Sequence, residues 1–442
     1  MRLDVHLEGA RGPVGKIDAE GSRFSFSYDA SYLRAPDNRP LSLSMPLRDR
    51  ALDEPASRFF FDNLLPEGRA LSDIARQHDL QDNDTAGLLA EIGAECAGAV
   101  GVVREGAPAP KHPGRFPDHY RAVSDEQLGE ILKNLVEGRQ PLPRDAQDIS
   151  LAGVQSKTAV LVDKDGCIHL ATRGAPTTHI LKVADAHFPR GVENEFFCMR
   201  LAAALGLAAA AVEMRVQENV PFLLVKRYDR IIHSDRTVHR LHQEDFAQGV
   251  GLPPACKYTH KGGRPLEYFF GELDKAAMRP ALLRRDLLRY VLFTYLIGNS
   301  DAHAKNFSLL HRSRADGGTR LAPLYDAACI VLYRDFRQGM ALSIGGKQAF
   351  DEIGRDAWDA FARATKLRYR FVRDEMAEIA TAIVPTAKRL REELPGLTDF
   401  GAGRIVDAIG QQVRLASDSF KLGLDPDTGP THEHAPGWAM PS

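Results

Sequence analysis

The feature that most constrains this chain is an apolar stretch that ends at a glycine and is followed at once by closely spaced polar residues. Residues 286–296 form a strongly amphipathic pattern, which predicts a helix with Gly298 as its C-terminal cap. Asp301 follows, Asn306 stands five residues after it, and Asp326 comes after one further predicted hairpin. The fold must therefore hold three polar side chains on the loop and hairpin that follow a buried helix.

A carboxylate followed by an amide and a second carboxylate is the set of groups that phosphoryl transfer requires. The first carboxylate orients the attacking hydroxyl group, and the other two groups hold Mg²⁺. Protein kinases use the spacing D-x-x-x-x-N and add a metal-binding Asp on the next hairpin; Asp301, Asn306 and Asp326 match this spacing. Asn, Ser and Asp are also common turn residues, so the motif alone leaves an ordinary polar turn equally open.

Length and composition restrict the class of protein. The chain has 442 residues, enough for two or three domains, and its 44% apolar and 26% charged residues are typical of a soluble globular protein. The 57 basic and 59 acidic residues give a net charge of −2, so binding to nucleic acid would need a local basic patch. Five scattered cysteines without metal-ligand spacing predict reduced thiols and a cytoplasmic location. No apolar stretch approaches membrane-spanning length, so we expect no membrane contact.

Residues 1–105 are predicted to form a small domain in which strands precede helices. Residues 3–7 and 24–28 alternate apolar and polar side chains, which predicts two half-buried strands. The aromatic residues 59–61 begin a helical region, and we interpret them as core. Pro, Gly and Ala then become frequent, so residues 106–147 are assigned as a linker and helix.

Residues 148–230 are predicted to form a β-rich small lobe that begins with a phosphate loop. The small residues at 150–158 precede a strand at 159–162 and its hairpin partner. A loop between strands with free backbone N–H groups can cover phosphates. It is not the loop of the P-loop NTPases, because Gly153 and Lys157 lack that motif's spacing and a strand follows instead of a helix.

One lysine stands among the apolar residues of the predicted strand 179–183. A lysine on a central strand is disfavoured unless its amine meets an anion, so Lys182 is a candidate ligand for the α- and β-phosphates of a nucleotide. An edge-strand lysine that faces solvent fits the local pattern equally well. A helix follows, and either Glu193 or Glu195 could pair with Lys182 as in protein kinases.

Two more strands, 211–216 and 221–225, complete a predicted sheet of about five strands. They lead into residues 226–230, where a hinge between lobes would bind the adenine edge through its backbone while Tyr228 packs on the ring. From 231 to 422 helical patterns dominate, which predicts a helical large lobe. The remaining C-terminal residues are rich in Pro, Gly, Asp and His, which predicts disorder.

Several uncommon motifs occur in one order along the chain. They lie at residues 60–66, 91–93 with 98–100, 150–158, 192–195, 240–246 and 301–307. Together they resemble the HipA family, the serine/threonine-kinase toxins of bacterial toxin–antitoxin pairs, and the resemblance extends to about residue 420. It implies an α+β, kinase-like two-lobed fold with a β-rich small lobe, an all-helical large lobe and an N-terminal α+β subdomain.

The resemblance also assigns roles to individual residues. Asp301 would be the catalytic base, with Asn306 and Asp326 as Mg²⁺ ligands. The ATP site would be formed by Ala152, Gly153, Val154, Gln155, Ser156 and Lys157 of the phosphate loop, by Lys182, by Lys226, Arg227 and Tyr228 of the hinge, and by His303, Ala304, Lys305, Asn306 and Tyr325.

A serine ahead of the phosphate loop is autophosphorylated in the family, which implies this role for Ser150, with Ser156 as the rival site. A phosphate there would repel the nucleotide. The chain departs from the family at two positions. Lys226 stands where an acid is common, which puts adenine contacts through that side chain in doubt, and Ser156 stands where better-known members carry Glu.

The leading functional hypothesis is an ATP- and Mg²⁺-dependent protein serine/threonine kinase that acts as a toxin. By resemblance, its substrate would be a translation component such as an aminoacyl-tRNA synthetase. Its partner would be a small helix-turn-helix antitoxin of the HipB type, which would bring it to operator DNA.

Two alternatives stay open. The chain could serve mainly as an antitoxin-bound co-repressor, with residues 365–370 as a basic patch that contacts DNA phosphates, although an ordinary solvated helix start has the same pattern. It could also be a small-molecule phosphotransferase of the aminoglycoside type, which shares the D-x-x-x-x-N spacing. The first hundred residues argue against this, because such enzymes normally begin with the small lobe.

Overall fold

The computed structural model describes the whole chain except residues 22, 54, 140–156, 173, 186–187, 277–278, 313–317, 334–338, 395–396, 398–400 and 426–442. The predicted phosphate-loop residues Ala152–Ser156 and the predicted phosphorylation site Ser150 lie outside the described residues, as does most of the C-terminal tail.

Residues 1–104, here called the N-terminal unit, fold around an antiparallel sheet of their own. Its strands, in spatial order, are β4 (Leu52–Asp53), β3 (Arg23–Tyr28), β2 (Gly15–Glu20), β1 (Arg2–Leu7) and β5 (Val100–Arg104). The helices beside it are α1 (Ala30–Arg34), α2 (Ala56–Asp62), α3 (Gly68–Gln77) and α4 (Thr85–Ile92). The two predicted strands are confirmed as β1 and β3. Phe60 and Phe61 are fully buried in this unit's core, as expected of the aromatic residues.

The small lobe is built on a six-stranded antiparallel sheet. In spatial order its strands are β11 (Val212–Gln217), β12 (Val220–Lys226), β10 (His179–Val183), β8 (Lys157–Val162), β9 (Ile168–Ala171) and β7 (Tyr120–Ala122). The segment assigned as a linker thus supplies β7, in which Tyr120 pairs with Ala171. The alternation of side chains along β12 buries Leu223 against α6 (Gly191–Ala204) and Leu224 against α5 (Asp125–Val136). The two helices therefore cover opposite faces of the sheet.

The large lobe is dominated by helices packed around one apolar core. They are α7 (Phe246–Gly249), α8 (Leu266–Ala276), α9 (Pro280–Leu296), α10 (Arg355–Ala364), α11 (Tyr369–Glu393) and α12 (Ala402–Phe420). The C-terminal half of α9 is deeply buried, since its residues from Tyr290 to Leu296 are all buried. The apolar core therefore extends along α9 up to the loop that contains Asp301.

The large lobe is not all-helical as the resemblance implied, because short strands accompany the helices. They are β13 (Arg230–Ile232), β14 (Thr237–Arg240), β15 (His242–Asp245), β16 (Ser308–His311), β17 (Arg320–Leu321), β18 (Gly339–Ile344) and β19 (Lys347–Ala349). Two of them, β16 and β17, form the hairpin that was predicted before Asp326. Pairing between segments far apart in the chain explains most of the difference. His242 pairs with His311, for example, and no local pattern reveals a contact across so many residues. β14 also pairs with β6 (Gly114–Arg115) of the segment assigned as a linker.

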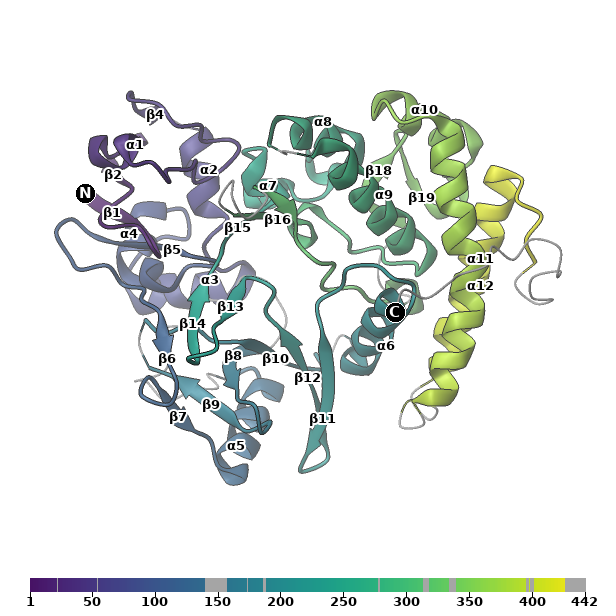
Figure 1. The fold of residues 1–442 in the computed structure, drawn as a ribbon, viewed down its shortest axis with the longest axis horizontal. Coiled ribbons are helices and arrows are strands. Elements are labelled where there is room, and N and C mark those ends of the chain that lie inside the picture. The colour runs from purple at the N-terminus through teal and green to yellow at the C-terminus, as the bar shows by residue number, and fades with distance from the viewer. Residues whose placement is uncertain are drawn as a thin grey trace.

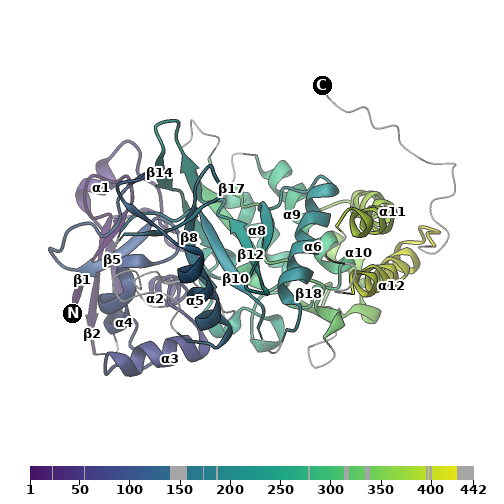
Figure 2. The same ribbon diagram turned by 90° about the horizontal axis from the view of Figure 1, so that it is seen from below.

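Figures 1 and 2 show how these parts are arranged. The N-terminal unit lies at one end of the molecule and helices α10, α11 and α12 lie at the other, with the small-lobe sheet and α9 between them. None of the helices in the described part of the chain combines the length and apolar character that crossing a membrane requires.

Candidate active site

The loop that follows α9 is held against the segment that follows Asp326. Gly298 has a φ of +63°, and a Cβ atom there would lie 2.5 Å from Val331 Cγ2. The carbonyl oxygen of Gly298 accepts hydrogen bonds from the N–H groups of Ile330 and Val331, each at 3.1 Å. Glycine is therefore required both for the turn and for the close approach, and it ties together the two segments that carry the predicted site.

Asp301 is exposed, and its carboxylate is bound to a residue that the sequence did not suggest. The hydroxyl group of Tyr258 donates a hydrogen bond of 2.7 Å to Asp301 Oδ1. The Asp301 side chain still reaches solvent. Desolvation by the surrounding protein raises its pKa, while the hydrogen bond from Tyr258 opposes the shift. The ring of His303 meets that of Tyr258 edge to face at 5.1 Å, and burial lowers the pKa of His303 to about 3.

Asp326 joins a polar network whose other members are buried, while its own side chain is 39% exposed. Its Oδ1 atom is 2.8 Å from Lys182 Nζ, and its Oδ2 atom accepts a hydrogen bond of 2.8 Å from the amide of Asn306. Lys182 also binds Glu195 at 2.8 Å, which answers the choice between the two glutamates of α6. Burial raises the pKa of Asp326, but Lys182 and Lys157 outweigh it and hold that pKa well below its usual range.

The backbone places Asp326 under the small lobe by two means. Leu324, two residues earlier, forms an isolated bridge with Ala209 between α6 and β11. Asp326 itself has a φ of +58°, a left-handed conformation that costs free energy in a residue other than glycine. Such strain persists where surrounding contacts impose it, and it is concentrated at functional sites.

Two lysines face one another on neighbouring strands of the small lobe. Lys157 on β8 pairs in register with Lys182 on β10, so their side chains lie on the same face of the sheet. Within the described residues Lys182 has two carboxylate partners, whereas Lys157 has no hydrogen bond or ion pair. Burial and the charge of Lys182 lower the pKa of Lys157 to about 8. A half-buried ammonium group without an ion pair among the described residues is suited to an anionic ligand.

The oxygen atoms of Asp326 and Asn306 are of the type that Mg²⁺ prefers. Mg²⁺ is usually held by one or two carboxylates together with substrate phosphates and water. The described part of the chain contains no group of three or more His, Cys, Asp and Glu side chains that could form a metal site without such help. The residue types present therefore fit a metal that binds together with a nucleotide. In this structure Asn306 Oδ1 accepts a hydrogen bond from the N–H of His303 and its Nδ2 faces Asp326, so metal binding requires the amide to turn.

The remaining predicted nucleotide residues lie close to this network. The Tyr325 hydroxyl donates to the carbonyl of Lys305 at 2.7 Å, and its ring lies 5.4 Å from that of Tyr228. Ala304 and His303 are buried on the same loop. The amine of Lys305, however, binds Glu67 of the N-terminal unit at 2.7 Å, so this side chain is already neutralised.

Two backbone N–H groups of the predicted hinge already donate hydrogen bonds within the protein. The N–H of Lys226 donates to Ala211 at 2.8 Å and the N–H of Arg227 donates to Thr178 at 2.9 Å. The side chain of Arg227 pairs with Asp229 at 3.2 Å. An adenine ring that binds here would have to use other backbone groups than these two N–H donors.

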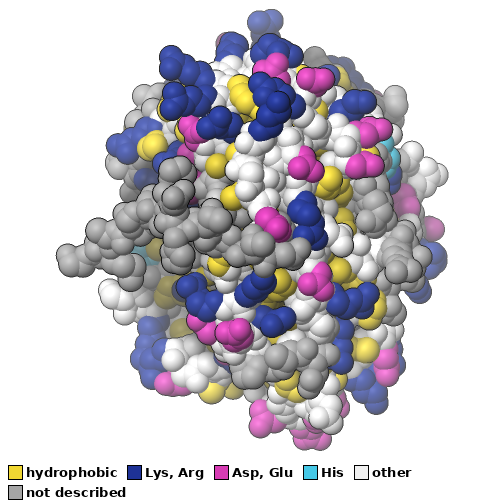
Figure 3. Space-filling view, turned by 90° about the vertical axis from the view of Figure 1, so that its right-hand side faces the viewer, with side chains coloured by type: hydrophobic (Ala, Val, Ile, Leu, Met, Phe, Trp, Pro, Cys, Tyr) yellow, Lys and Arg dark blue, Asp and Glu magenta, His cyan; other side chains and the backbone are white. Residues whose placement is uncertain are grey.

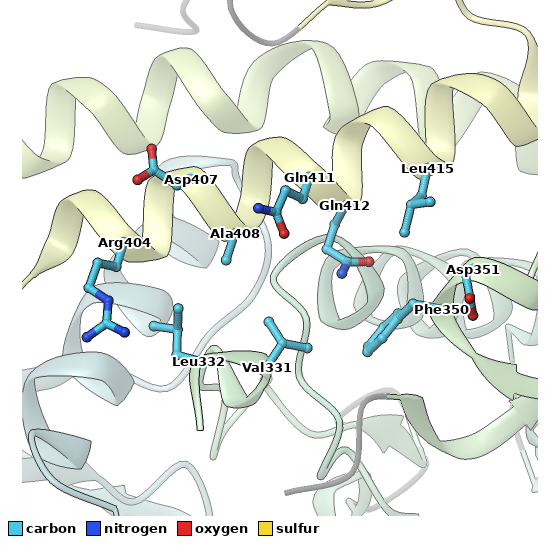
Figure 4. Close-up of a pocket in the computed structure, with 10 residues that line it drawn as sticks. All are labelled: Val331, Leu332, Phe350, Asp351, Arg404, Asp407, Ala408, Gln411, Gln412 and Leu415. Carbon is cyan, nitrogen blue, oxygen red and sulfur yellow. The ribbon is translucent and has the colours of Figure 1, made fainter. Parts of the chain in front are cut away.

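A separate cavity of about 500 Å³ lies on the far side of the large lobe, between α12 and the segments around Leu332 and Phe350 (Figure 4). The Gln412 side chain points into it from α12, and its buried Oε1 atom has no hydrogen-bond partner. None of the predicted site residues lines this cavity, so it is distinct from the network around Asp326.

Comparisons with known proteins place both parts of the chain in one family. The HipA N-terminal domain family matches residues 3–103, and the HipA-like C-terminal domain family matches residues 149–387. A protein of Sinorhizobium fredii named as a kinase, Y4mE, is 37% identical over 373 residues, which cover 84% of this chain and 88% of that protein. The serine/threonine-protein kinase toxin HipA of Shewanella oneidensis is 28% identical over 78% of each chain.

The overall structure supports the same relationship. A solved complex of Shewanella oneidensis HipA with HipB and its operator DNA contains a chain that matches this one with a TM-score of 0.76 and 25% identity, over 96% of this chain and 98% of that one. The expected α+β kinase-like fold is thereby confirmed. The chain belongs to the HipA family of serine/threonine kinases.

Proposed function

We propose that this protein is an ATP- and Mg²⁺-dependent protein serine/threonine kinase that acts as the toxin of a toxin–antitoxin pair in the cytoplasm. The observation that carries the proposal is the network of Asn306, Asp326 and the Lys182–Glu195 pair. Asp301 lies on the same loop as Asn306 and is bound to Tyr258. By relationship to HipA, the substrate would be a protein of translation, such as an aminoacyl-tRNA synthetase.

Each residue has a defined task in this proposal. Asp301 accepts the proton of the attacking serine or threonine hydroxyl group, and its position beside solvent lets a substrate reach it. Asp326 and Asn306 hold Mg²⁺, which would neutralise charge on the phosphates. Lys182 and Lys157 bind phosphate oxygens, and Glu195 fixes the direction of Lys182.

Among the described residues, the proposed phosphate loop begins at Lys157. Ala152–Ser156 would complete the loop ahead of it. Tyr228 and Tyr325 would flank the nucleotide base from the hinge side. Autophosphorylation of Ser150 would add a charge of about −1.5 to −2 beside the nucleotide's own phosphates and so weaken ATP binding.

Replacing the two carboxylates tests the chemistry. Asp301→Asn and Asp326→Asn should each reduce transfer of the γ-phosphate by several powers of ten, because they remove the base or a metal ligand. Asp356→Asn is the control, because this exposed residue of α10 lies outside the network. Mass spectrometry of the wild-type protein after incubation with ATP and Mg²⁺ should find phosphate on Ser150. Full transfer by either site variant would exclude these roles.

A second role concerns partners. The related Shewanella protein was solved with HipB and operator DNA, and we propose that this chain binds a HipB-like helix-turn-helix antitoxin and reaches operator DNA through that complex. The exposed basic side chains Lys366, Arg368 and Arg370, where α10 meets α11, favour an added contact with DNA phosphates. The N-terminal unit and the outer face of the large lobe are the expected antitoxin surfaces.

A further inference from the structure

One carboxylate of the N-terminal unit reaches the loop that carries the predicted base. Glu67 precedes the first residue of α3, and its side chain is only 15% exposed. Its two oxygen atoms bind two different lysines, Lys257 at 2.7 Å and Lys305 at 2.7 Å. These lysines lower the pKa of Glu67 to about 2 against the effect of burial, so the group is a carboxylate at neutral pH.

Lys257 connects Glu67 to the predicted base, Asp301. Lys257 is followed by Tyr258, whose hydroxyl group donates to Asp301 at 2.7 Å. The carbonyl oxygen of Lys257 also accepts a hydrogen bond of 3.1 Å from the N–H of Ala304, on the same loop as Asp301. Displacement of Lys257 would therefore move both the donor that orients Asp301 and a support of its loop.

Lys305 connects Glu67 to the predicted metal ligand Asn306. Lys305 immediately precedes Asn306, whose amide is bound to Asp326. Its amine also donates to the carbonyl of Asn63 at 3.3 Å, and its own carbonyl accepts from Tyr325 at 2.7 Å. Lys305 is thus fixed at both ends, and the side-chain end is fixed by the N-terminal unit alone.

We propose that Glu67 is a positioning residue for phosphoryl transfer, which makes the N-terminal unit a structural part of the active site. Glu67 orients Asp301 through Lys257 and Tyr258, and it orients Asn306 through Lys305. It also neutralises two ammonium groups that would otherwise repel each other and compete for nucleotide phosphates. This inference rests on the proposed kinase function.

Steady-state kinetics of the full-length protein tests the inference. Glu67→Gln keeps the shape of the side chain and removes its charge. We expect kcat for phosphoryl transfer to fall at least tenfold while the KM for ATP changes less than threefold, because the phosphate-binding lysines 157 and 182 are untouched. Glu67→Asp, which keeps the charge, should recover part of kcat. Tyr258→Phe combined with Glu67→Gln should be no slower than the slower single variant, because part of the effect of Glu67 passes through Tyr258.

The matched control is Glu8→Gln. Glu8 is also a buried carboxylate of the N-terminal unit that crosses to the kinase lobes, where it binds Arg240 at 2.8 Å, but it does not touch the Asp301 loop. This variant should keep kcat within twofold. Equal losses in the Glu67 and Glu8 variants would show general loosening of the interface and overturn the proposal, as would an unchanged kcat in Glu67→Gln.

Two further measurements distinguish failure of the positioning role from failure of the kinase assignment. If Glu67→Gln does not fold, Lys305→Met and Lys257→Met test the same tether from the other side, and unchanged kcat in both would overturn it. Asp301→Asn is measured in parallel. If that variant loses transfer while Glu67→Gln keeps it, only the positioning role fails; if Asp301→Asn retains transfer, the kinase assignment fails and the inference fails with it.

Discussion

Among single residues, Lys157 and Lys182 show how two like side chains acquire different tasks. They face each other across β8 and β10, but only Lys182 is balanced by carboxylates. Lys182 therefore belongs to the folded framework with or without a nucleotide. Lys157 is half-buried, and its side chain has no ion pair among the described residues; desolvation disfavours its charged form and lowers its pKa to about 8. An arriving phosphate would supply the missing counter-charge.

Replacement of Lys157 should consequently weaken ATP binding without weakening the fold. Hydrogen bonds to charged groups contribute about 1.5–3 kcal/mol, so Lys157→Met should raise the Kd for ATP roughly tenfold to a hundredfold. Because the free amine is protonated only below about pH 8, wild-type affinity should fall as the pH rises through 8, while the variant should show a flat response. Calorimetric titration between pH 6.5 and 9.5 measures both. Equal affinity and equal pH response in the two proteins would contradict the phosphate role.

At the scale of elements, the end of α9 determines where the reactive groups lie. The helix delivers Asp301 to the cleft, and Gly298 lets the chain turn while its carbonyl holds the segment after Asp326. Main-chain hydrogen bonds thus fix the end of α9 and its loop to the segment that follows Asp326. A side chain at this glycine should disturb all three.

Gly298→Ala should therefore destabilise the fold more than other glycine replacements. The left-handed backbone costs an alanine about 1–2 kcal/mol, and the clash with Val331 adds about 1–3 kcal/mol for overpacking. Gly346→Ala is the control, because Gly346 also has a positive φ, of +81°, yet a Cβ atom there would have open space. Urea unfolding should show a loss of roughly 2–5 kcal/mol for Gly298→Ala and only the backbone part, about 1–2 kcal/mol, for the control. Similar losses would argue against close packing at Gly298.

The elements also show how far sequence reasoning reaches. Strongly periodic segments such as β1, β10 and α9 were predicted because their side-chain patterns are local. The roles of Asp301, Asn306 and Asp326 were inferred from the kinase spacing together with several uncommon motifs in one order, because the spacing alone also fits a polar turn. Glu67 and Tyr258 were missed, because their roles depend on contacts with residues that are far away in the sequence. Glu67 contacts a lysine 238 residues later, and Tyr258 contacts Asp301, 43 residues later. The strand β7 was missed for a similar reason, as its pairing with β9 lies outside its own Pro- and Gly-rich surroundings.

At the scale of the whole molecule, two surfaces far apart serve different expected partners. The N-terminal unit lies at one end of the molecule, and the face formed by α10, α11 and α12 lies at the other (Figure 1). Lys and Arg side chains gather at the top of this second face (Figure 3), the end where α10 meets α11 in Figure 1. With a net charge of only −2 for the chain, such a local cluster is what contact with nucleic acid would require. Phosphoryl transfer and DNA contact should therefore be separable by mutation.

Removing the cluster's unpaired cations should affect DNA alone. Lys366 and Arg368 are exposed, and neither has an ion pair within the part of the chain that the structure describes. Each cation that contacts a phosphate contributes about 0.9 to the salt dependence of binding. In the complex with its antitoxin, Lys366→Ala with Arg368→Ala should therefore weaken operator binding and reduce the slope of log Kobs against log[salt] by about 2. Lys388→Ala with Arg389→Ala removes two exposed cations from the opposite end of α11 and should leave the slope unchanged. Fluorescence anisotropy from 50 to 300 mM salt gives both slopes, and the same proteins should retain full phosphoryl transfer. An unchanged slope in the first variant would place the DNA contacts in the antitoxin alone.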